Sequence, residues 1–262
     1  DAVNRPTWAR RDTVRIYERL HGVTDPGEQA ALDYVAPRVQ GRAILDIGVG
    51  AGRTIDLLRP VSRDYIGIDY TQEMVLACRK QHPDVRIEQM DARDLHAFED
   101  GRFAFVMFSY NGIDSVGPQD RRRVLREVHR VLQPQGLFMF SGHNQHGPGP
   151  GERPHMHIPF SWNPLKLGWR SFKSIRAWPR TLMNHKRFSA LNERHEGWSV
   201  LNAGAHEFGV VIMFTSLAEQ KRQLREAGFE CEAVFDNKRG QRVGDDADTS
   251  DMWWFHYVAR KV

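Results

Sequence analysis

Cysteine is scarce in this chain, which has only Cys78 and Cys231 among its 262 residues. Two cysteines provide neither a disulfide framework nor a cysteine cluster for a metal ion, so we expect a reducing, cytoplasmic setting and no metal site. Long apolar stretches are also missing, because no run reaches the roughly 18 residues that span a bilayer. The charged N-terminus has no apolar signal-peptide core. The sequence therefore predicts no membrane partner.

Acidic residues are rare between 143 and 213, where nine Lys and Arg stand against four Glu. This local excess accounts for the positive net charge of +4. Four of the seven tryptophans lie there too. We interpret 145–213 as an inserted, basic, Trp-rich lid with one helix near 164–194 and a strand near 206–213. Its tryptophans could line a pocket for a flat or anionic small molecule, stack single-stranded RNA bases, or form the core of the lid or a dimer contact.

Outside that insertion, apolar strand-like runs alternate with helix-like runs. Helical spacing of apolar residues marks 71–83, 119–136 and 216–229. The expected strands are 43–48, 64–69, 85–91, 103–109, 137–144, 230–236 and 252–262. Strands and helices that alternate at this spacing predict an α/β fold, with a parallel sheet and helices on both of its faces.

The stretch "AILDIGVGAGRT" (43–54) places a glycine-rich turn directly after the first strand. In an open α/β sheet, ligands bind beyond the carboxyl ends of the strands. A triphosphate loop needs a Gly-Lys pair, which is missing here. A dinucleotide loop needs a third glycine where Arg53 stands. What remains is an acid followed by glycines at alternate positions, Asp46, Gly48, Gly50 and Gly52.

These motifs resemble those of the class I S-adenosylmethionine-dependent methyltransferases over roughly 35–144 and, more weakly, 214–262. "LDIGVGAGRT", "IGIDYTQEMV", "EQMDARDL" and "LREVHRVLQPQGLFMFS" follow one another in the family order. The resemblance implies a doubly wound, Rossmann-like sheet of seven strands, mostly parallel with the last strand antiparallel. It divides the chain into a methyltransferase domain (1–144 and 214–262, with 1–34 as a helical cap) and the inserted lid at 145–213.

The resemblance also implies cofactor-binding roles. Asp46 is expected to orient the ammonium group of S-adenosylmethionine, and the turn at Gly48, Gly50 and Gly52 to pack beside its methionine and ribose. Asp69 is expected to accept both ribose hydroxyls. The remaining expected cofactor contacts are Tyr70 and Met74 beside the adenine, Asp91 and Ala92 at its edge, Tyr17 from the cap, and Ser109 after the fourth strand.

The acceptor is expected above the ends of the fourth and fifth strands. His143 follows the fifth strand and is the preferred general base, since imidazole takes up protons near neutral pH. Its expected neighbours around the acceptor are Tyr110, Asn111, Asn144 and Trp162. The segment "SYNG" (109–112) lacks the Asn/Asp-Pro-Pro-aromatic signature of amino-group DNA methyltransferases, which disfavours methylation of a base's amine.

The favoured hypothesis is methyl transfer to an oxygen or nitrogen, less favourably a carbon, of a small molecule, such as one of secondary metabolism. Two alternatives stay open: an RNA or protein methyltransferase that uses the basic insertion, and a cofactor-binding protein without turnover. A nucleic acid partner is not favoured, because the basic residues are spread out. A homodimer is a further hypothesis.

Overall fold

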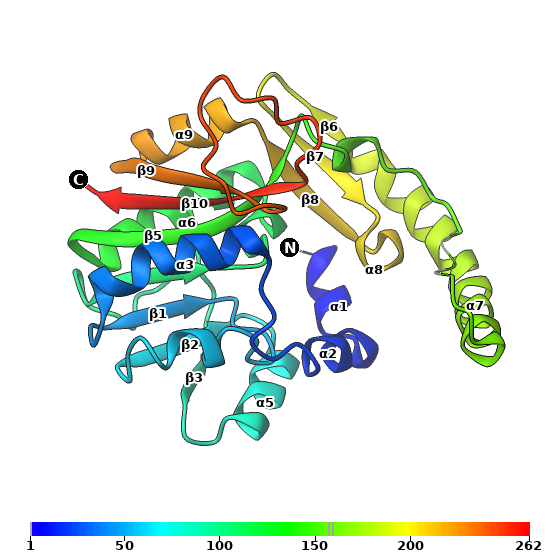
Figure 1. Cartoon of the computed structure of the whole chain (residues 1–262), viewed down its shortest axis with the longest axis horizontal. Helices are drawn as coiled ribbons and strands as arrows, with labels where there is room; N and C mark the ends of the chain where they lie inside the picture. Colours follow the sequence, from blue (N-terminus) through cyan, green and yellow to red (C-terminus); the bar gives the residue numbers. More distant parts are fainter. Residues whose placement is uncertain (1, 157, 159) are drawn as a thin grey trace.

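A computed structural model of the chain describes residues 2–156, 158 and 160–262. Its frame is a sheet with the strand order β3-β2-β1-β4-β5-β10-β9 (Figure 1). These strands are β1 (Ile44–Ile47), β2 (Tyr65–Asp69), β3 (Arg86–Gln89), β4 (Phe103–Phe108), β5 (Leu132–Asn144), β9 (Phe229–Asp236) and β10 (Trp254–Lys261). They are parallel except β10, which is antiparallel to both β5 and β9. The predicted Rossmann-like class and the antiparallel last strand are confirmed.

Helices cover both faces of this sheet and bury two apolar clusters. On one face lie α3 (Pro26–Val39), α4 (Ile55–Leu58) and α5 (Gln72–Gln81), which contribute Val35, Leu58 and Cys78. On the other lie α6 (Pro118–Val131) and α9 (Leu217–Glu226), which contribute Val128 and Leu224. The strands between them are almost wholly buried, which is why their sequences read as continuous apolar runs.

The insertion adds three strands, so the sheet has ten strands and not the seven expected. These are β6 (Glu193–Arg194), β7 (Trp198–Ala203) and β8 (Val210–Thr215). β8 joins the end of β5 in parallel, with His143 opposite Phe214 and Asn144 opposite Thr215. β4 pairs with β5 only as far as Phe140, so β8 takes the same edge of β5 further along, opposite the edge that β10 occupies. The insertion is therefore partly an extension of the sheet.

The rest of the insertion is helical. The short turns η2 (Gly149–Gly151) and η3 (Ser189–Leu191) flank the long helix α7 (Pro164–Phe188), and α8 (Ala205–Phe208) connects β7 to β8. Helix α7 stands away from the sheet at one side of the molecule (Figure 1). None of the helices formed by the described residues combines the length and the apolar character that crossing a bilayer requires.

The N-terminal segment reaches the carboxyl edge of the sheet through α1 (Asn4–Trp8) and α2 (Arg11–Tyr17). The Asn4 side chain donates to the Ser115 and Val211 carbonyls at 2.9 and 2.8 Å, and it accepts from the Val211 amide. Helix α3 instead packs on the face of β9 and β10. The predicted cap at 1–34 therefore consists of two parts. The residues before Asp25 reach the carboxyl edge of the sheet, whereas α3, which has Asp25 as its N-cap residue, belongs to one face of the sheet.

Candidate functional site

The turn after β1 is bare backbone in a conformation that favours glycine. Gly48, Gly50 and Gly52 have φ of +68°, +56° and +106°. A Cβ on Gly48 would lie 2.9 Å from the Phe108 ring, and one on Gly52 2.7 Å from the His82 ring. Side chains at these positions would be strained and would collide with neighbours. The turn therefore presents its amides at the edge where α/β folds bind ligands.

Asp69 ends β2 and closes onto this turn. Its Oδ2 accepts from the Gly50 amide at 3.0 Å, and its Oδ1 accepts from the Thr71 amide at 2.8 Å. Burial raises the pKa of Asp69 to about 6, although the two backbone donors oppose that shift. Each carboxylate oxygen keeps a further lone pair. Asp69 can therefore accept from a ligand diol, as predicted for the ribose hydroxyls.

Asp46 lies below the turn and is fully buried. Its Oδ2 accepts from the Tyr65 hydroxyl at 2.7 Å and from the Thr54 hydroxyl, whereas its Oδ1 has no partner among the described residues. Burial raises the pKa of Asp46 to about 6. The role expected from the sequence, that Asp46 orients the ammonium group of the cofactor, stays a prediction. The unpartnered Oδ1 is the part of the side chain that is left for a ligand donor.

A buried ion pair that the sequence analysis missed supports the same turn. Arg53 bonds the Glu28 carboxylate with both terminal nitrogens, at 2.6 and 2.7 Å, and donates to Ser109 Oγ at 2.9 Å. Its guanidinium also lies 4.9 Å from the Tyr110 ring centroid. The only sequence signal was Arg53 itself, which had been used to exclude a dinucleotide loop. Ser109 therefore lies at the turn, but its hydroxyl is shared with Arg53.

The predicted adenine contacts Tyr70 and Asp91 follow β2 and β3, and Asp91 already has partners. Arg93 holds Asp91 through Nε at 3.0 Å and Nη2 at 2.6 Å, and it bonds Asp120 at 2.7 Å. Despite desolvation, which opposes the shift, these Arg93 bonds lower the pKa of Asp91. The Arg5 guanidinium lies 4.9 Å from the Tyr70 ring centroid. An adenine amine would have to share Asp91 with Arg93.

The remaining cofactor-side residues contact one another at the mouth of the turn. Met74 is buried in a small cluster with Ala51 and Ala77, against which Tyr17 packs. Ala92 is half-buried and packs against the main core. Tyr17 comes from α2 and lies 3.7 Å from where a Gly50 Cβ would be. The structure thus brings Tyr17 over the glycine turn, as predicted.

Aromatic rings continue from Tyr17 over the crevice. Tyr17 lies edge-on to Tyr110, with ring centroids 6.0 Å apart, and Trp8 lies 4.9 Å from His206. His206 belongs to α8, so the insertion reaches the crevice through this short turn. Burial lowers the pKa of His206. Five non-glycine residues here have positive φ, namely Tyr110, Asn111, His206, Glu207 and Phe208. Such strained backbone gathers at functional sites.

A histidine–carboxylate pair lies at the end of β5. Asp114, in η1 (Gly112–Ser115), accepts from the His143 amide at 2.6 Å and pairs with His143 Nδ1 at 2.8 Å. Its other oxygen accepts from Arg121 at 2.6 Å, and both partners of that ion pair are buried. With Nδ1 donating to Asp114, His143 Nε2 is free to accept a proton. Nε2 lies 3.4 Å from the Asn111 amide nitrogen.

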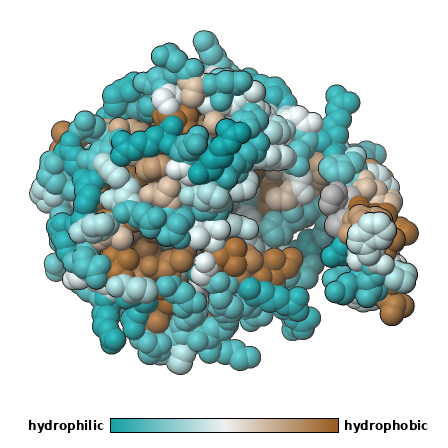
Figure 2. All heavy atoms as spheres, viewed as in Figure 1, coloured by the Kyte–Doolittle hydropathy of each residue, from teal (hydrophilic) through white to brown (hydrophobic). Residues whose placement is uncertain are grey.

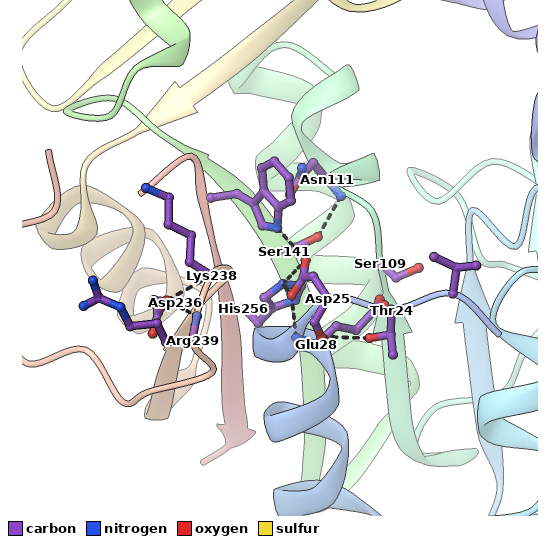
Figure 3. Close-up of polar contacts among 12 residues, drawn as sticks. Thr24, Asp25, Glu28, Ser109, Asn111, Ser141, Asp236, Lys238, Arg239 and His256 are labelled. Atoms are coloured by element: carbon purple, nitrogen blue, oxygen red, sulfur yellow. Dashed lines mark hydrogen bonds and ion pairs between the residues drawn. The ribbon is translucent and has the colours of Figure 1, made fainter. Parts of the chain in front are cut away.

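Aromatic side chains and a second polar cluster flank His143. Its ring lies 5.3 Å from Phe214 and 6.3 Å from Trp254. Trp254 donates to Asp25 at 2.9 Å, and His256 pairs with the same carboxylate. Figure 3 shows Asp25 beside His256, with Asn111 near the middle of the view. These contacts tie the N-terminus of α3 to the strand that borders His143.

The structure gives two of the expected acceptor-binding residues different surroundings. Asn144 is 1% exposed, and its amide donates to the Thr249 and Met252 carbonyls at 2.7 and 3.0 Å. It therefore holds the loop before β10. Trp162 is 92% exposed just before α7 and contacts the Phe160 ring. Neither residue joins the cluster around His143. Among the described residues, no three metal-ligating side chains gather at one place.

Comparisons with known proteins match this architecture. Residues 44–136 match the methyltransferase domain family. A probable S-adenosylmethionine-dependent methyltransferase of Mycobacterium tuberculosis is 31% identical over 144 residues, which are 55% of this chain and 45% of that protein. An uncharacterized methyltransferase of Bacillus subtilis is 36% identical over 38% of this chain and 40% of its own. The chain thus matches less than half the length of these curated relatives.

Solved structures extend the likeness of the fold over nearly the whole chain. A Mesorhizobium loti S-adenosylmethionine-dependent methyltransferase has a TM-score of 0.60 at 21% identity, covering 90% of this chain and 98% of its own. A Burkholderia thailandensis 1,6-didemethyltoxoflavin-N1-methyltransferase has a TM-score of 0.61 at 15% identity, covering 100% and 88%. Residues 44–136 thus belong to the methyltransferase domain family, and the fold of the chain around them is similar to that of solved S-adenosylmethionine-dependent methyltransferases.

Proposed function

We propose that this chain binds S-adenosylmethionine in the crevice beyond β1 and β2 and transfers its methyl group to a small molecule. The observation that carries this proposal is the glycine turn at positive φ, with the Asp69 carboxylate closed onto the Gly50 amide. The turn has no lysine and no phosphate loop, but it does have a carboxylate suited to a diol. This donor and acceptor set fits a nucleoside without phosphate groups.

In this proposal, different residues around the turn contact different parts of the cofactor. Asp69 accepts the ribose hydroxyls, and Tyr70, Met74, Asp91 and Ala92 surround the adenine. The methionine end lies along the glycine turn, above Asp46 and the Arg53–Ser109 contact, with Tyr17 closing over it. The cofactor, when bound, supplies a methyl group carried on a positively charged sulfur.

His143 acts as the general base in this proposal. Nε2 would take the proton from the acceptor's hydroxyl or amine, while the cofactor would supply the methyl group and leave as S-adenosylhomocysteine. Asp114 positions the ring and stabilises the imidazolium that results. Arg121 holds Asp114 from behind, in the buried interior. Asn111, which lies beside Nε2, is placed to orient the acceptor.

A small-molecule acceptor fits the walls of this site best. Half-buried Trp254 offers a flat apolar surface beside His143, which suits a planar ring, and buried Phe214 backs the His143 ring. The Burkholderia thailandensis neighbour is named for such an acceptor, and an oxygen or nitrogen target follows from the presence of a base. An RNA or protein acceptor, or cofactor binding without turnover, is the alternative. We further propose a cytoplasmic setting.

Calorimetric titration tests the cofactor assignment directly. We expect saturable 1:1 binding of S-adenosylmethionine and of S-adenosylhomocysteine, because both carry the diol and the amino acid end that the crevice fits. NAD⁺ should give no heat of binding, since Arg53 stands where a dinucleotide loop has its third glycine. Binding of NAD⁺ without binding of either sulfur nucleoside would overturn the proposal.

Replacement of His143 by glutamine tests the base. We expect turnover to fall by roughly 10²- to 10⁴-fold, the usual contribution of general base catalysis, with cofactor affinity unchanged. The readout is S-adenosylhomocysteine formation with whichever compound of an acceptor panel is methylated. His146→Gln is the matched control, because that imidazole is exposed and lies two residues after Asn144 in the same loop. Equal turnover in the two variants would remove His143 as the base.

A further inference from the structure

Helix α7 carries an apolar stripe that faces solvent. Leu165, Trp169, Phe172, Ile175 and Met183 recur at helical spacing and are all exposed, Leu165 by 83%. The Trp169 and Phe172 rings stack on each other, with centroids 6.0 Å apart. Figure 2 shows this hydrophobic surface on the arm that projects from the body. An exposed apolar stripe of this length marks an interaction surface.

A cationic stripe runs beside the apolar one. A basic residue directly follows four of the apolar residues, in the pairs Leu165-Lys166, Trp169-Arg170, Phe172-Lys173 and Ile175-Arg176. Since successive residues turn by about 100° around a helix, these cations lie along one flank of the stripe. Arg180, Lys186 and Arg187 bring the basic residues of α7 to seven, and its sequence holds no Asp or Glu.

The helix is attached at one end. Among the described residues, the contacts that pack α7 onto the body come from its C-terminal part: Thr181 is buried, Asn184 donates to the Glu207 carbonyl at 2.9 Å, and His185 contacts the Phe208 ring. The N-terminal part extends outward from the body (Figure 1), and the residues of the apolar stripe on it are exposed. The body therefore holds the stripe in a fixed direction without covering it.

We propose that α7 docks into the surface of an anionic lipid bilayer, with the apolar stripe among the acyl chains and the basic flank at the headgroups. Helices that lie in a membrane interface combine Trp, Phe and Leu on one face with Lys and Arg on the other, and each cation near an anionic leaflet strengthens binding by about fivefold. This proposal departs from the sequence-based prediction of no membrane partner, which rests on the lack of a spanning run and of a signal-peptide core. An interfacial helix needs no spanning run, and this proposal does not depend on methyl transfer.

Two other occupants fit the stripe less well. A second copy of the chain packing its α7 against this one would bring two cationic flanks together, and no acid on the helix would offset them. Single-stranded RNA would use the cations and the aromatic rings, but it would leave Leu165, Ile175 and Met183 without partners. Charge and apolar surface together favour the lipid.

Vesicle flotation with the full chain tests the proposal. We expect the protein to float with phosphatidylcholine vesicles that contain phosphatidylglycerol, to float at least tenfold less with phosphatidylcholine alone, and to be released by salt. Leu165→Gln with Phe172→Gln should reduce binding to the anionic vesicles at least tenfold. Lys166→Glu with Lys173→Glu should do the same. Leu76→Gln and Arg126→Glu, exposed changes on α5 and α6, are the matched controls and should bind as wild type.

Three results would overturn lipid docking. The first is equal recovery with and without anionic vesicles. The second is a dimer in sedimentation velocity that dissociates in Leu165→Gln with Phe172→Gln, which would assign the stripe to a second copy. The third is salt-sensitive binding of single-stranded RNA that the lysine changes abolish and Leu165→Gln with Met183→Gln leaves intact. S-adenosylmethionine affinity should be unchanged in every α7 variant, so failure here is distinguishable from failure of the cofactor assignment.

Discussion

Asp69→Ala should weaken S-adenosylmethionine binding by roughly 10²- to 10⁴-fold. The carboxylate is the only side chain at the end of β2 that is placed both to bond the glycine turn and to accept a diol. Hydrogen bonds to a charged group contribute about 1.5–3 kcal/mol each, and the two ribose hydroxyls would lose theirs together. Calorimetry at neutral pH measures the loss.

Asp33→Ala is the matched control, since Asp33 is exposed on α3 and bonds only Gln29 in the described part of the chain. It should bind cofactor as wild type does. A thermal melt of each variant separates loss of the site from loss of the fold. Unchanged affinity in Asp69→Ala would show that the crevice does not hold the ribose where we place it.

The pH dependence of binding follows from the same residue. Because the folded, cofactor-free protein holds the pKa of Asp69 near 6, above its usual 3.8, the carboxyl takes up a proton as the pH falls through 6. That proton must leave before both oxygens can accept. Affinity should therefore drop roughly tenfold from pH 7 to pH 5, while the ligand's α-amino group stays protonated. Asp69→Asn should lose this part of the dependence.

The raised pKa has the opposite consequence for the stability of the cofactor-free protein. Between about pH 4 and 6 the folded form binds this proton more tightly than the unfolded form does. The contribution of Asp69 to the free energy of unfolding therefore decreases as the pH rises through that window. Asp46, whose pKa is raised to about 6 for the same reason, acts in the same direction.

Asp114→Ala should cost about 3–5 kcal/mol of folding stability and nearly all turnover. Arg121 is buried beneath the sheet's carboxyl edge, and removal of its carboxylate partner leaves a guanidinium charge without a counterion in the interior. For a chain of this size that loss lowers the melting temperature by roughly 6–20 °C. Thermal unfolding followed by circular dichroism measures it. His143 loses the acceptor of its Nδ1 proton in the same variant.

The double variant Asp114→Ala with Arg121→Met separates the two effects. It removes the stranded charge, so it should recover part of the stability, while turnover should stay as low as in His143→Gln. Asp120→Ala serves as the control, because its ion pairs with Arg93 and Arg123 are partly exposed and contribute at most about 1 kcal/mol. A change in stability below 1 kcal/mol for Asp114→Ala would contradict the buried-pair account. Full turnover in the double variant would contradict the positioning role.

Local patterns in the sequence were sufficient for the sheet and for the cofactor side of the crevice. The apolar runs at 43–48 and 103–109 are buried strands because both of their faces are covered by helices. Gly48, Gly50 and Gly52 predicted a turn in a conformation that favours glycine, and the acid at the end of β2 was identified by its position alone. Each of these features depends on neighbours within a few residues.

The acceptor side depended on contacts between distant parts of the chain. Arg53 bonds Glu28, which is 25 positions away in the chain, and His143 bonds Asp114, which is 29 positions away. Neither pairing produces a periodic pattern in the sequence. Asn144 follows His143 directly, yet its amide turns to the loop at 249–252. The insertion reaches the crevice through His206 and not through Trp162, because β7 and β8 join the sheet and carry α8 inward.

The sequence by itself determined a methyltransferase-type sheet, its glycine turn and the acids that end its strands, because backbone conformation and strand burial are encoded by residue type and spacing. Only the tertiary structure decided which polar groups share a proton, which are enclosed as ion pairs, and which face of α7 is left uncovered. Those outcomes depend on burial and on distances between elements, and a linear pattern of residues does not contain them.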